Sequence, residues 1–273
     1  MGGKTARRRV YRVRLDTATG SATTSIDQRA DLLAVEEPLE IRIDDQPLTV
    51  TMRTPGDDID LAAGFLYTEG LLASLDDVTG IRMCDENVAA VTPRPGIAIH
   101  AQNRTFVTTS ACGVCGKDSI EAIRVRSRFD LTKDRTSVRP AVLAALPDRL
   151  RQAQRVFAST GGLHAAGLFD ETGNLLVLRE DVGRHNAVDK VAGWALREHK
   201  LPLAGHVLVV SGRASFELVQ KAVMLGVPVL AAVSAPSSLA VSLADESGLT
   251  LVGFLRGETM NVYAGAERLL AAS

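Results

Sequence analysis

The two cysteines in the stretch TTSACGVCGKDS, residues 108–119, are the residues of this chain whose types and spacing most directly suggest chemistry. Cys112 and Cys115 are separated by two residues, each is followed by a glycine, and Lys117 comes next. The only other cysteine of the chain is Cys84. Two thiols this close can hold a metal ion, form a redox-active disulfide or carry a sulfur atom, and each chemistry needs a different setting.

A structural zinc site needs four ligands, which usually come as two close pairs. The chain has one such pair, because Cys84 is isolated and His100 has no second histidine at the usual spacing. The base-deaminase pattern of H-x-E followed by P-C-x-x-C is absent as well. We therefore expect no permanently bound metal, although a structural metal clip made by the two cysteines stays an alternative.

A dithiol oxidoreductase is the second alternative. A redox-active C-x-x-C pair of the thioredoxin type opens a helix directly after a strand, and the stretch TFVTTSACGVCGKDSIEAIR can supply a strand, a loop and a helix. Several residues of the loop are small, which favours a flexible segment over a rigid active-site turn.

Sulfur carriage needs an exposed cysteine that ionises readily. Cys115 lies just before the predicted start of a helix, where the helix dipole and Lys117 favour the thiolate. Gly113 and Gly116 leave room for a bulky donor or acceptor to reach the sulfur, and the second cysteine can accept or resolve the cargo of the first. This combination favours a sulfur carrier over the two alternatives.

The first half of the chain predicts a β-rich domain around these cysteines. Alternating apolar residues predict two strands within 36–55 and a strand pair over 87–94 and 97–102, and acidic residues near the start of 54–72 predict a helix there. Further helices are expected over 117–129 and 139–158, the second beginning at Pro140 and broken or kinked at Pro147.

The second half predicts an α/β domain. Near-continuous apolar strands alternate with helical segments from Gly161 onward, which indicates parallel βαβ units covered on both faces. The predicted strands are 163–170, 175–181, 206–213, 227–235 and 249–257, and the predicted helices are 182–199, 214–226 and 236–248. We therefore divide the chain into a β-rich domain over 1–137 and an α/β domain over 138–273.

Polar residues follow the ends of these strands, where open α/β sheets bind their ligands. They form four clusters, namely Glu180–Asn186, Ser211–Arg213, Ser234–Ser238 and Arg256–Thr259. Arginine, serine hydroxyls and helix N-terminal amides suit a phosphate or pyrophosphate group, so Arg213 and Ser215 are candidate ligand contacts. Ordinary helix capping and an ion pair between Arg213 and Glu217 explain the same residues without a ligand. No dinucleotide-binding or P-loop glycine pattern is present.

Asp181 and His185 follow one predicted strand and are spaced for an acid/base pair. A helix-capping aspartate and a hydrogen-bonded structural histidine are the simpler interpretation, and we prefer it. His164, at the start of a predicted strand, is expected to be structural as well.

The bulk properties exclude several classes of function. The chain has 273 residues, 46% of them hydrophobic, and a net charge of −1, so neither nucleic acid nor an anionic membrane is indicated as a partner. It has no apolar run long enough to span a bilayer, and its basic N-terminus lacks the apolar region of a secretory signal. We expect Arg7–Arg9 to belong to a solvated tail and the protein to be cytoplasmic, with reduced thiols.

Several long motifs, taken in order, resemble the FdhD family of formate dehydrogenase accessory sulfurtransferases across nearly the whole chain. They are ACGVCGK, STGGLHAAGLF, REDVGRHNAVDKVAG, VSGRASFELVQKA, GVPVLAAVSAPSSLAVSLA and LTLVGFLRGETMNVY. The resemblance implies an α/β fold with a cytidine-deaminase-like mixed sheet flanked by helices, which lacks the deaminase zinc ligands, and a smaller β-rich N-terminal domain. It also implies a homodimer.

The resemblance further implies that the protein accepts sulfur from a cysteine desulfurase as a persulfide. The sulfur would then pass to the Mo-bis(molybdopterin guanine dinucleotide) cofactor, bound as a ligand, or to its tungsten counterpart, before insertion into formate dehydrogenase. By the same resemblance, Cys112 is the expected carrier and Cys115 its partner. The cofactor-binding segment matches Phe254, Leu255, Arg256, Gly257, Glu258 and Thr259. A cofactor chaperone whose cysteines form a metal clip, and a dithiol oxidoreductase, remain the alternatives.

Overall fold

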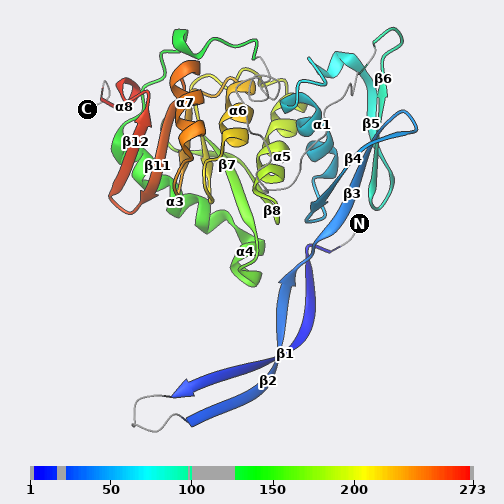
Figure 1. Ribbon diagram of the computed structural model, residues 1–273, viewed down its shortest axis with the longest axis vertical. Coiled ribbons are helices and arrows are strands. Elements are labelled where there is room, and N and C mark those ends of the chain that lie inside the picture. Colours follow the sequence, from blue (N-terminus) through cyan, green and yellow to red (C-terminus); the bar gives the residue numbers. More distant parts are fainter. Residues whose placement is uncertain (1–2, 17–22, 98, 100–126, 271–273) are drawn as a thin grey trace.

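The chain forms three separate sheets in the computed structural model, which describes residues 3–16, 23–97, 99 and 127–270 (Figure 1). A six-stranded sheet with helices on both faces makes up the larger part of the molecule. A four-stranded sheet lies near the N-terminus, and a two-stranded arm projects away from both (Figure 1). This arrangement confirms the predicted α/β fold with a mixed sheet and a smaller β-rich N-terminal part. The boundary at residue 137 stays a prediction.

The strands of the larger sheet lie in the order β12-β11-β10-β9-β7-β8. They are β7 (His164–Asp170), β8 (Leu175–Asp181), β9 (His206–Val210), β10 (Val229–Ala232), β11 (Thr250–Arg256) and β12 (Thr259–Ala264). The strands β9, β10 and β11 are parallel, as predicted, whereas β7 is antiparallel to both β8 and β9. The parallel prediction is wrong for β7, because the short turn between β7 and β8 leaves no room for a crossover.

Helices cover both faces of this sheet. They are α3 (Pro140–Ala153), α4 (Arg155–Thr160), α5 (Arg184–Arg197), α6 (Phe216–Met224), α7 (Ser238–Ser247) and α8 (Glu267–Leu270). Within β9, Leu208 packs in the core cluster with α5, α6 and α7, and Val207 packs in the cluster with α3. Successive side chains of a strand point to opposite faces, so a strand buried on both faces has to be apolar throughout.

The helix α3 continues through Pro147, where a kink or break was predicted. It begins with Pro140 in the first turn and ends at Ala153, and α4 follows after Gln154. The break therefore falls several residues after the proline. Apolar packing of Leu143, Leu146 and Leu150 in one core cluster holds the helix together across the missing N–H group.

The smaller sheet has the order β4-β3-β6-β5. Its strands are β3 (Glu37–Ile43), β4 (Gln46–Arg53), β5 (Val78–Asp85) and β6 (Val88–Pro93), and its helix is α1 (Asp58–Thr68). Two short 3-10 helices, η1 (Leu75–Asp77) and η2 (Leu131–Lys133), complete the described elements. The β3–β4 hairpin and α1 confirm the prediction, whereas β6 pairs with β3 and β5. Most of 97–102, its predicted partner, lies outside the described residues.

The two parts are joined where α1 crosses α5. The crossing is close because glycines face backbone on both helices: a Cβ at Gly64 would collide with the Asp189 carbonyl, and one at Gly193 with the Asp60 carbonyl. One side of α1 packs in the core of the smaller sheet through Leu61 and Leu66, and Ala63 and Tyr67 pack in the core of the larger one. The helix therefore belongs to both cores.

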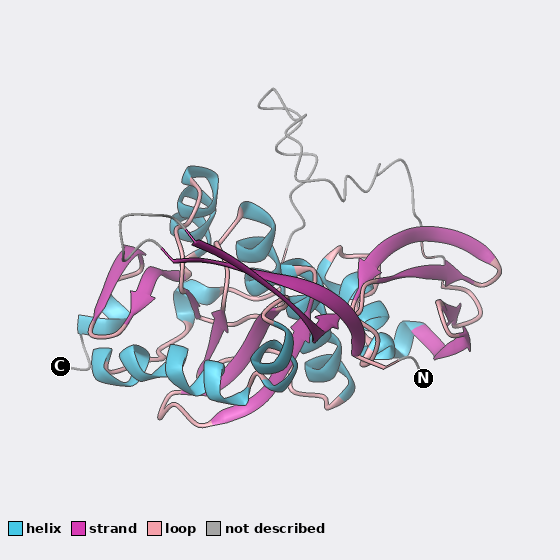
Figure 2. Cartoon of the chain, turned by 90° about the horizontal axis from the view of Figure 1, so that it is seen from below, coloured by secondary structure: helices cyan, strands magenta, loops and turns pink. Residues whose placement is uncertain are grey.

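The arm consists of β1 (Thr5–Asp16) and β2 (Thr23–Ala34), which pair in antiparallel register along their whole length (Figure 2). The prediction that Arg7–Arg9 belong to a tail is wrong, since these arginines lie in β1, where they are largely exposed. Tyr11, Val13 and Leu15 alternate with arginines, which is the period of two that is typical of a strand. The high arginine content of this segment masked that pattern.

Residues 100–126, with both cysteines of the C-x-x-C pair and most of the helix predicted over 117–129, lie outside the described residues. Cys84 is described and is exposed on β5. In the part of the chain that the structure describes, none of the helices is long and apolar enough to cross a membrane.

Candidate functional site

The polar clusters predicted from the sequence meet at one edge of the larger sheet. The strands β8, β9, β10 and β11 run in the same direction, so their carboxyl ends lie along this edge. The antiparallel strands β7 and β12 begin there, which adds His164 and Thr259 to the same edge. We call this the strand-end edge. It brings together residues that are far apart in the sequence.

Backbone contacts tie the loops of the strand-end edge together. Ala214 forms an isolated parallel bridge with Pro236, and its N–H donates to the Ala235 carbonyl at 3.2 Å. The Ser211 hydroxyl accepts from the Ala165 N–H at 2.9 Å, and the Ser237 hydroxyl accepts from the Ala240 N–H at 3.3 Å, capping α7. Ser211 and Ser237 therefore make hydrogen bonds within the fold, in line with the simpler interpretation that explains the serines at strand ends without a ligand.

Ser215 is used differently. It is the N-cap residue of α6, yet its side chain makes no capping hydrogen bond. Its hydroxyl lies 3.3 Å from His185 Nε2 and donates to the Glu217 carboxylate. His185 Nε2 is also 3.9 Å from Glu217 Oε2. The three side chains form a chain in which the imidazole N–H can donate to the serine oxygen and the serine to the carboxylate.

The electrostatics of this group favour a neutral imidazole. Burial, together with the positive charges of Arg184 and Lys221, lowers the pKa of His185 to about 4. Burial opposes ionisation of Glu217, but the hydrogen bond from Ser215 keeps the pKa of this carboxyl below its ordinary value. At neutral pH the group therefore consists of a neutral histidine, a hydroxyl and an ionised glutamate.

Asp181 does not pair with His185, so the acid/base pair considered from the sequence does not form. Its carboxylate is fully buried and lies 2.7 Å from Lys190 Nζ. It also accepts hydrogen bonds from the N–H groups of Gly183 at 2.8 Å and Thr54 at 3.2 Å and from Asn186 Nδ2 at 3.1 Å. The preferred structural interpretation holds, although the residue anchors the loop before α5 and is not its N-cap.

The segment Phe254–Thr259 forms the end of β11 and the turn into β12. Phe254 has a φ of 51°, a left-handed conformation that a bulky side chain adopts only when its surroundings require it. The pairing of β11 with β12 shifts register at this point, and the Arg256 guanidinium lies 5.3 Å from the Phe254 ring centroid. Residues 256–259 are exposed, whereas the Leu255 side chain is buried in the core and cannot contact a ligand.

Arg213 is exposed on the loop after β9, and within the described residues it forms no ion pair with Glu217, the alternative considered for it. Arg213 lies two residues before Ser215 in the chain, so the two candidate ligand contacts predicted from the strand ends both lie at the strand-end edge. Arg184 belongs to the predicted cluster Glu180–Asn186, but the sequence did not single it out as a candidate ligand contact.

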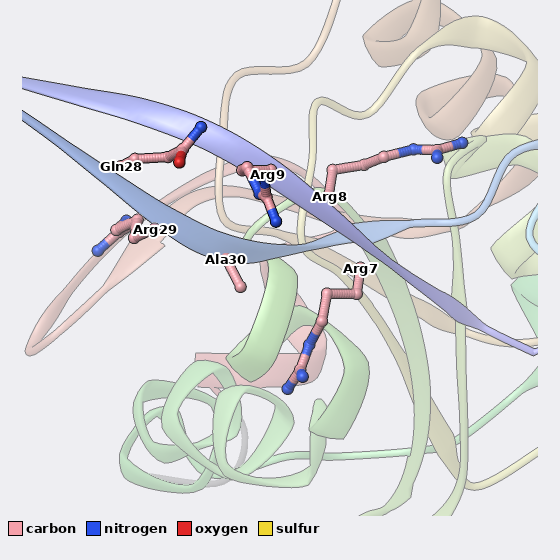
Figure 3. Close-up of a pocket in the computed structure, with 6 residues that line it drawn as sticks. All are labelled: Arg7, Arg8, Arg9, Gln28, Arg29 and Ala30. Carbon is pink, nitrogen blue, oxygen red and sulfur yellow. The ribbon is translucent and has the colours of Figure 1, made fainter.

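A second feature was missed as well. The arm carries an open concavity of about 510 Å³ lined by Arg7, Arg8, Arg9, Gln28, Arg29 and Ala30 (Figure 3). It lies on the β1–β2 ribbon and not at the strand-end edge. Arg29 is partly neutralised by Asp31, whose carboxylate is 3.7 Å away.

Comparisons with known proteins agree on one family. A model described as the FdhD/NarQ family matches residues 34–270. Curated proteins named sulfur carrier protein FdhD are similar over almost the whole chain. The Nocardia farcinica protein is 57% identical over 281 residues, which cover 100% of this chain and 97% of the relative. The Saccharolobus solfataricus protein is 43% identical over 243 residues, which cover 88% of this chain and 91% of the relative.

A solved structure shares the fold. It is a crystal structure described as that of a formate dehydrogenase accessory protein from Desulfotalea psychrophila, with a TM-score of 0.76 and 25% identity. The match covers 98% of this chain and 100% of that chain. Sequence and structure therefore lead to the same group of proteins.

Proposed function

We propose that this chain, which belongs to the FdhD/NarQ family, is a sulfur carrier that receives sulfur from a cysteine desulfurase as a persulfide on Cys112 and passes it to a molybdenum cofactor destined for formate dehydrogenase. The observation that carries the proposal is the match over the whole chain to proteins named sulfur carriers. Its chemistry rests on the Cys112–Cys115 pair, in which each cysteine is followed by a glycine.

Loading Cys112 requires a simple exchange. Its thiolate attacks the terminal sulfur of the donor's persulfide, a new sulfur–sulfur bond forms, and the donor cysteine leaves as a thiolate. Electrons balance without an external oxidant, because the transferred sulfur keeps its oxidation state. Cys115 would then accept the sulfur from Cys112 or release it from the Cys112 persulfide.

The strand-end edge would hold the cofactor, Mo-bis(molybdopterin guanine dinucleotide), as the substrate to be modified. Phe254, Arg256 and Thr259 surround a turn whose backbone is held in an unusual conformation, and such conformations concentrate at functional sites. Arg213 and Ser215 face the same edge. The guanidinium groups, exposed backbone and hydroxyls found here are suited to pyrophosphate groups.

We further propose that the protein is a cytoplasmic homodimer. Tyr11, Val13 and Leu15 alternate along one face of β1 and are 71%, 55% and 69% exposed, and Ile26, opposite Val13, is 64% exposed. A two-stranded ribbon is marginally stable alone, and an exposed apolar face of this kind usually marks a contact surface. Sedimentation of Val13→Asp against the unaltered protein tests the dimer, with Arg12→Ser on the other face of the arm as control.

The test of the sulfur carrier is mass spectrometry after incubation with a cysteine desulfurase and cysteine. A gain of about 32 Da on the peptide SACGVCGK, reversed by reductant and absent in Cys112→Ala, is expected. An unmodified peptide while the desulfurase turns over would refute the proposal. Stoichiometric zinc in freshly purified protein would point to the metal clip, and catalysed insulin reduction to the oxidoreductase.

A further inference from the structure

Arg184 is a charged side chain at the strand-end edge that the proposed function does not yet use. It is the first residue of α5, and its Nε is buried without a hydrogen-bond partner among the described residues. Asp181 and Glu217, two of the carboxylates of this edge, are engaged with other groups. Asp181 pairs with Lys190 at 2.7 Å, and Glu217 accepts from Ser215. The charge of Arg184 is therefore available to a ligand.

Two histidines flank this arginine. His185 follows it in the chain, and His164 lies on β7 across the loop after β9. Gly212 lies beside both His164 and Arg184: a Cβ placed there would lie 3.3 Å from His164 Nδ1 and 3.8 Å from Arg184 Cδ. With only hydrogen at this position, a small ligand can approach the backbone and the three side chains together.

Donors face the same place from the two helices that begin here. The N-cap residue of α5 is Gly183, which has no side chain that could cap the helix, and Ser215 at the N-cap of α6 makes no side-chain capping hydrogen bond. By contrast, Ser237 caps α7 in the usual way. The amides in the first turns of α5 and α6 thus add donors to the guanidinium, whereas the Ser215 hydroxyl is already engaged with Glu217.

We propose that Arg184, with His164 and His185 on either side, forms a subsite for a phosphate or pyrophosphate group. The inference rests on the proposed function, because it assigns part of the cofactor's dinucleotide moiety to these residues. A guanidinium binds such a group through two parallel hydrogen bonds, and the neutral His164 imidazole can donate a third. Arg184 would supply the charge and the histidines the orientation.

Filling this subsite is expected to favour the protonated forms of the histidines. In the free protein, burial and then the charge of Arg184 lower the pKa of both His164 and His185, to about 4 for His185. Lys221 on α6 also lowers the pKa of His185, whereas Glu217 and Glu69, the C-cap residue of α1, raise it. Asp181 raises the pKa of His164. A bound anion offsets the positive charges, so it raises both pKa values and binding becomes tighter as the pH falls.

Nuclear magnetic resonance of the imidazole nitrogens tests this directly, because the chain has only five histidines. The pH titration is recorded with and without inorganic pyrophosphate. We expect saturation to raise the pKa of His164 and His185 by about one unit or more, equivalent to tenfold tighter binding per unit. His206 begins β9 at the opposite edge of the sheet and His199 follows the far end of α5, so neither should shift.

Arg184→Gln separates ligand binding from a structural role. Without the guanidinium, both histidine pKa values should rise in the free protein, and pyrophosphate affinity should fall at least about tenfold. Arg184→Lys should keep the lowered pKa values because it keeps the charge. Arg139→Gln, an exposed arginine at the start of α3, is the matched control and should change neither quantity. Unchanged thermal unfolding of the variants confirms that they fold.

Two outcomes overturn the inference: histidine signals that ignore pyrophosphate, or an affinity that Arg184→Gln leaves unchanged. If either occurs while Cys112 still acquires sulfur, the subsite is wrong and the sulfur carrier stands. Conversely, histidine shifts in a protein whose Cys112 stays unmodified would support the anion subsite and refute the proposed function.

Discussion

Lys190→Met is expected to cost this protein much of its stability, because it leaves a carboxylate buried without its counter-ion. Lys190 and Asp181 are 1% and 0% exposed, with Nζ and Oδ2 2.7 Å apart. Lys190 Nζ also donates to the Thr54 carbonyl at 2.8 Å, which ties α5 to the end of β4. Methionine fills nearly the same volume, so the charge and its hydrogen bonds are the main loss.

The expected loss is about 3–4 kcal/mol. Removing one partner of a buried ion pair typically costs about 3–5 kcal/mol. Asp181 keeps three hydrogen bonds, from Thr54, Gly183 and Asn186, which places the cost toward the lower end of that range. The Thr54 carbonyl loses a donor, which adds about 1 kcal/mol. Total stabilities are only about 5–15 kcal/mol, so the change is large.

Urea unfolding followed by circular dichroism measures this difference. The matched control is Lys133→Met, since Lys133 pairs with Asp130 at 3.0 Å but with side chains 83% and 49% exposed, and should lose less than about 1 kcal/mol. Adding Asp181→Asn to Lys190→Met should recover part of the loss, because both charges are then gone. A loss below about 1 kcal/mol for Lys190→Met alone would refute the reasoning.

Three further predictions concern the helix crossing, a turn and the ligand segment. Gly193→Ala should destabilise the protein by about 1–3 kcal/mol in urea unfolding through its collision with Asp60, whereas Gly80→Ala, which meets nothing within 4 Å, should not. Hydrogen bonds from Thr172 and Asn174 outweigh burial and lower the pKa of Asp170, so this carboxylate stabilises the fold above pH 3.8 and less as the pH falls below it. Asp170→Asn should flatten the acid limb of a pH-dependent melting curve, and an unaltered limb would contradict this. Phe254→Gly should weaken binding of guanosine diphosphate in calorimetry without lowering the melting temperature, because glycine adopts a φ of 51° freely.

Elements with strong local patterns were predictable from the sequence. The continuous apolar residues of β9 and β10 predicted strands buried on both faces, and Val188, Val191, Ala192 and Ala195 predicted the helix that became α5. The clustering of arginine and serine after these strands followed from chain direction alone. Each of these signals is local, because a strand or a helix repeats its environment every two or every three to four residues.

Other features depend on pairings between distant residues. Ser215 reaches His185 across 30 positions, and Thr54 reaches Asp181 across 127. The direction of β7 was mispredicted, because a buried strand has the same composition in either orientation. The arm was predicted to be a solvated tail. The many arginines of β1 masked its alternating pattern, and its partner strand β2 begins only after residue 22.

The sequence by itself determined the chemical inventory of this protein: a pair of cysteines each followed by a glycine, strand ends rich in arginine and serine, and motifs specific enough to indicate a family. Tertiary structure alone decided which of these groups meet. It assigned Asp181 to a buried ion pair and left Arg184 beside two neutral histidines. The physical reason is that residue types and periodicities are local properties, whereas burial and the electric field at a side chain arise from all the elements packed around it.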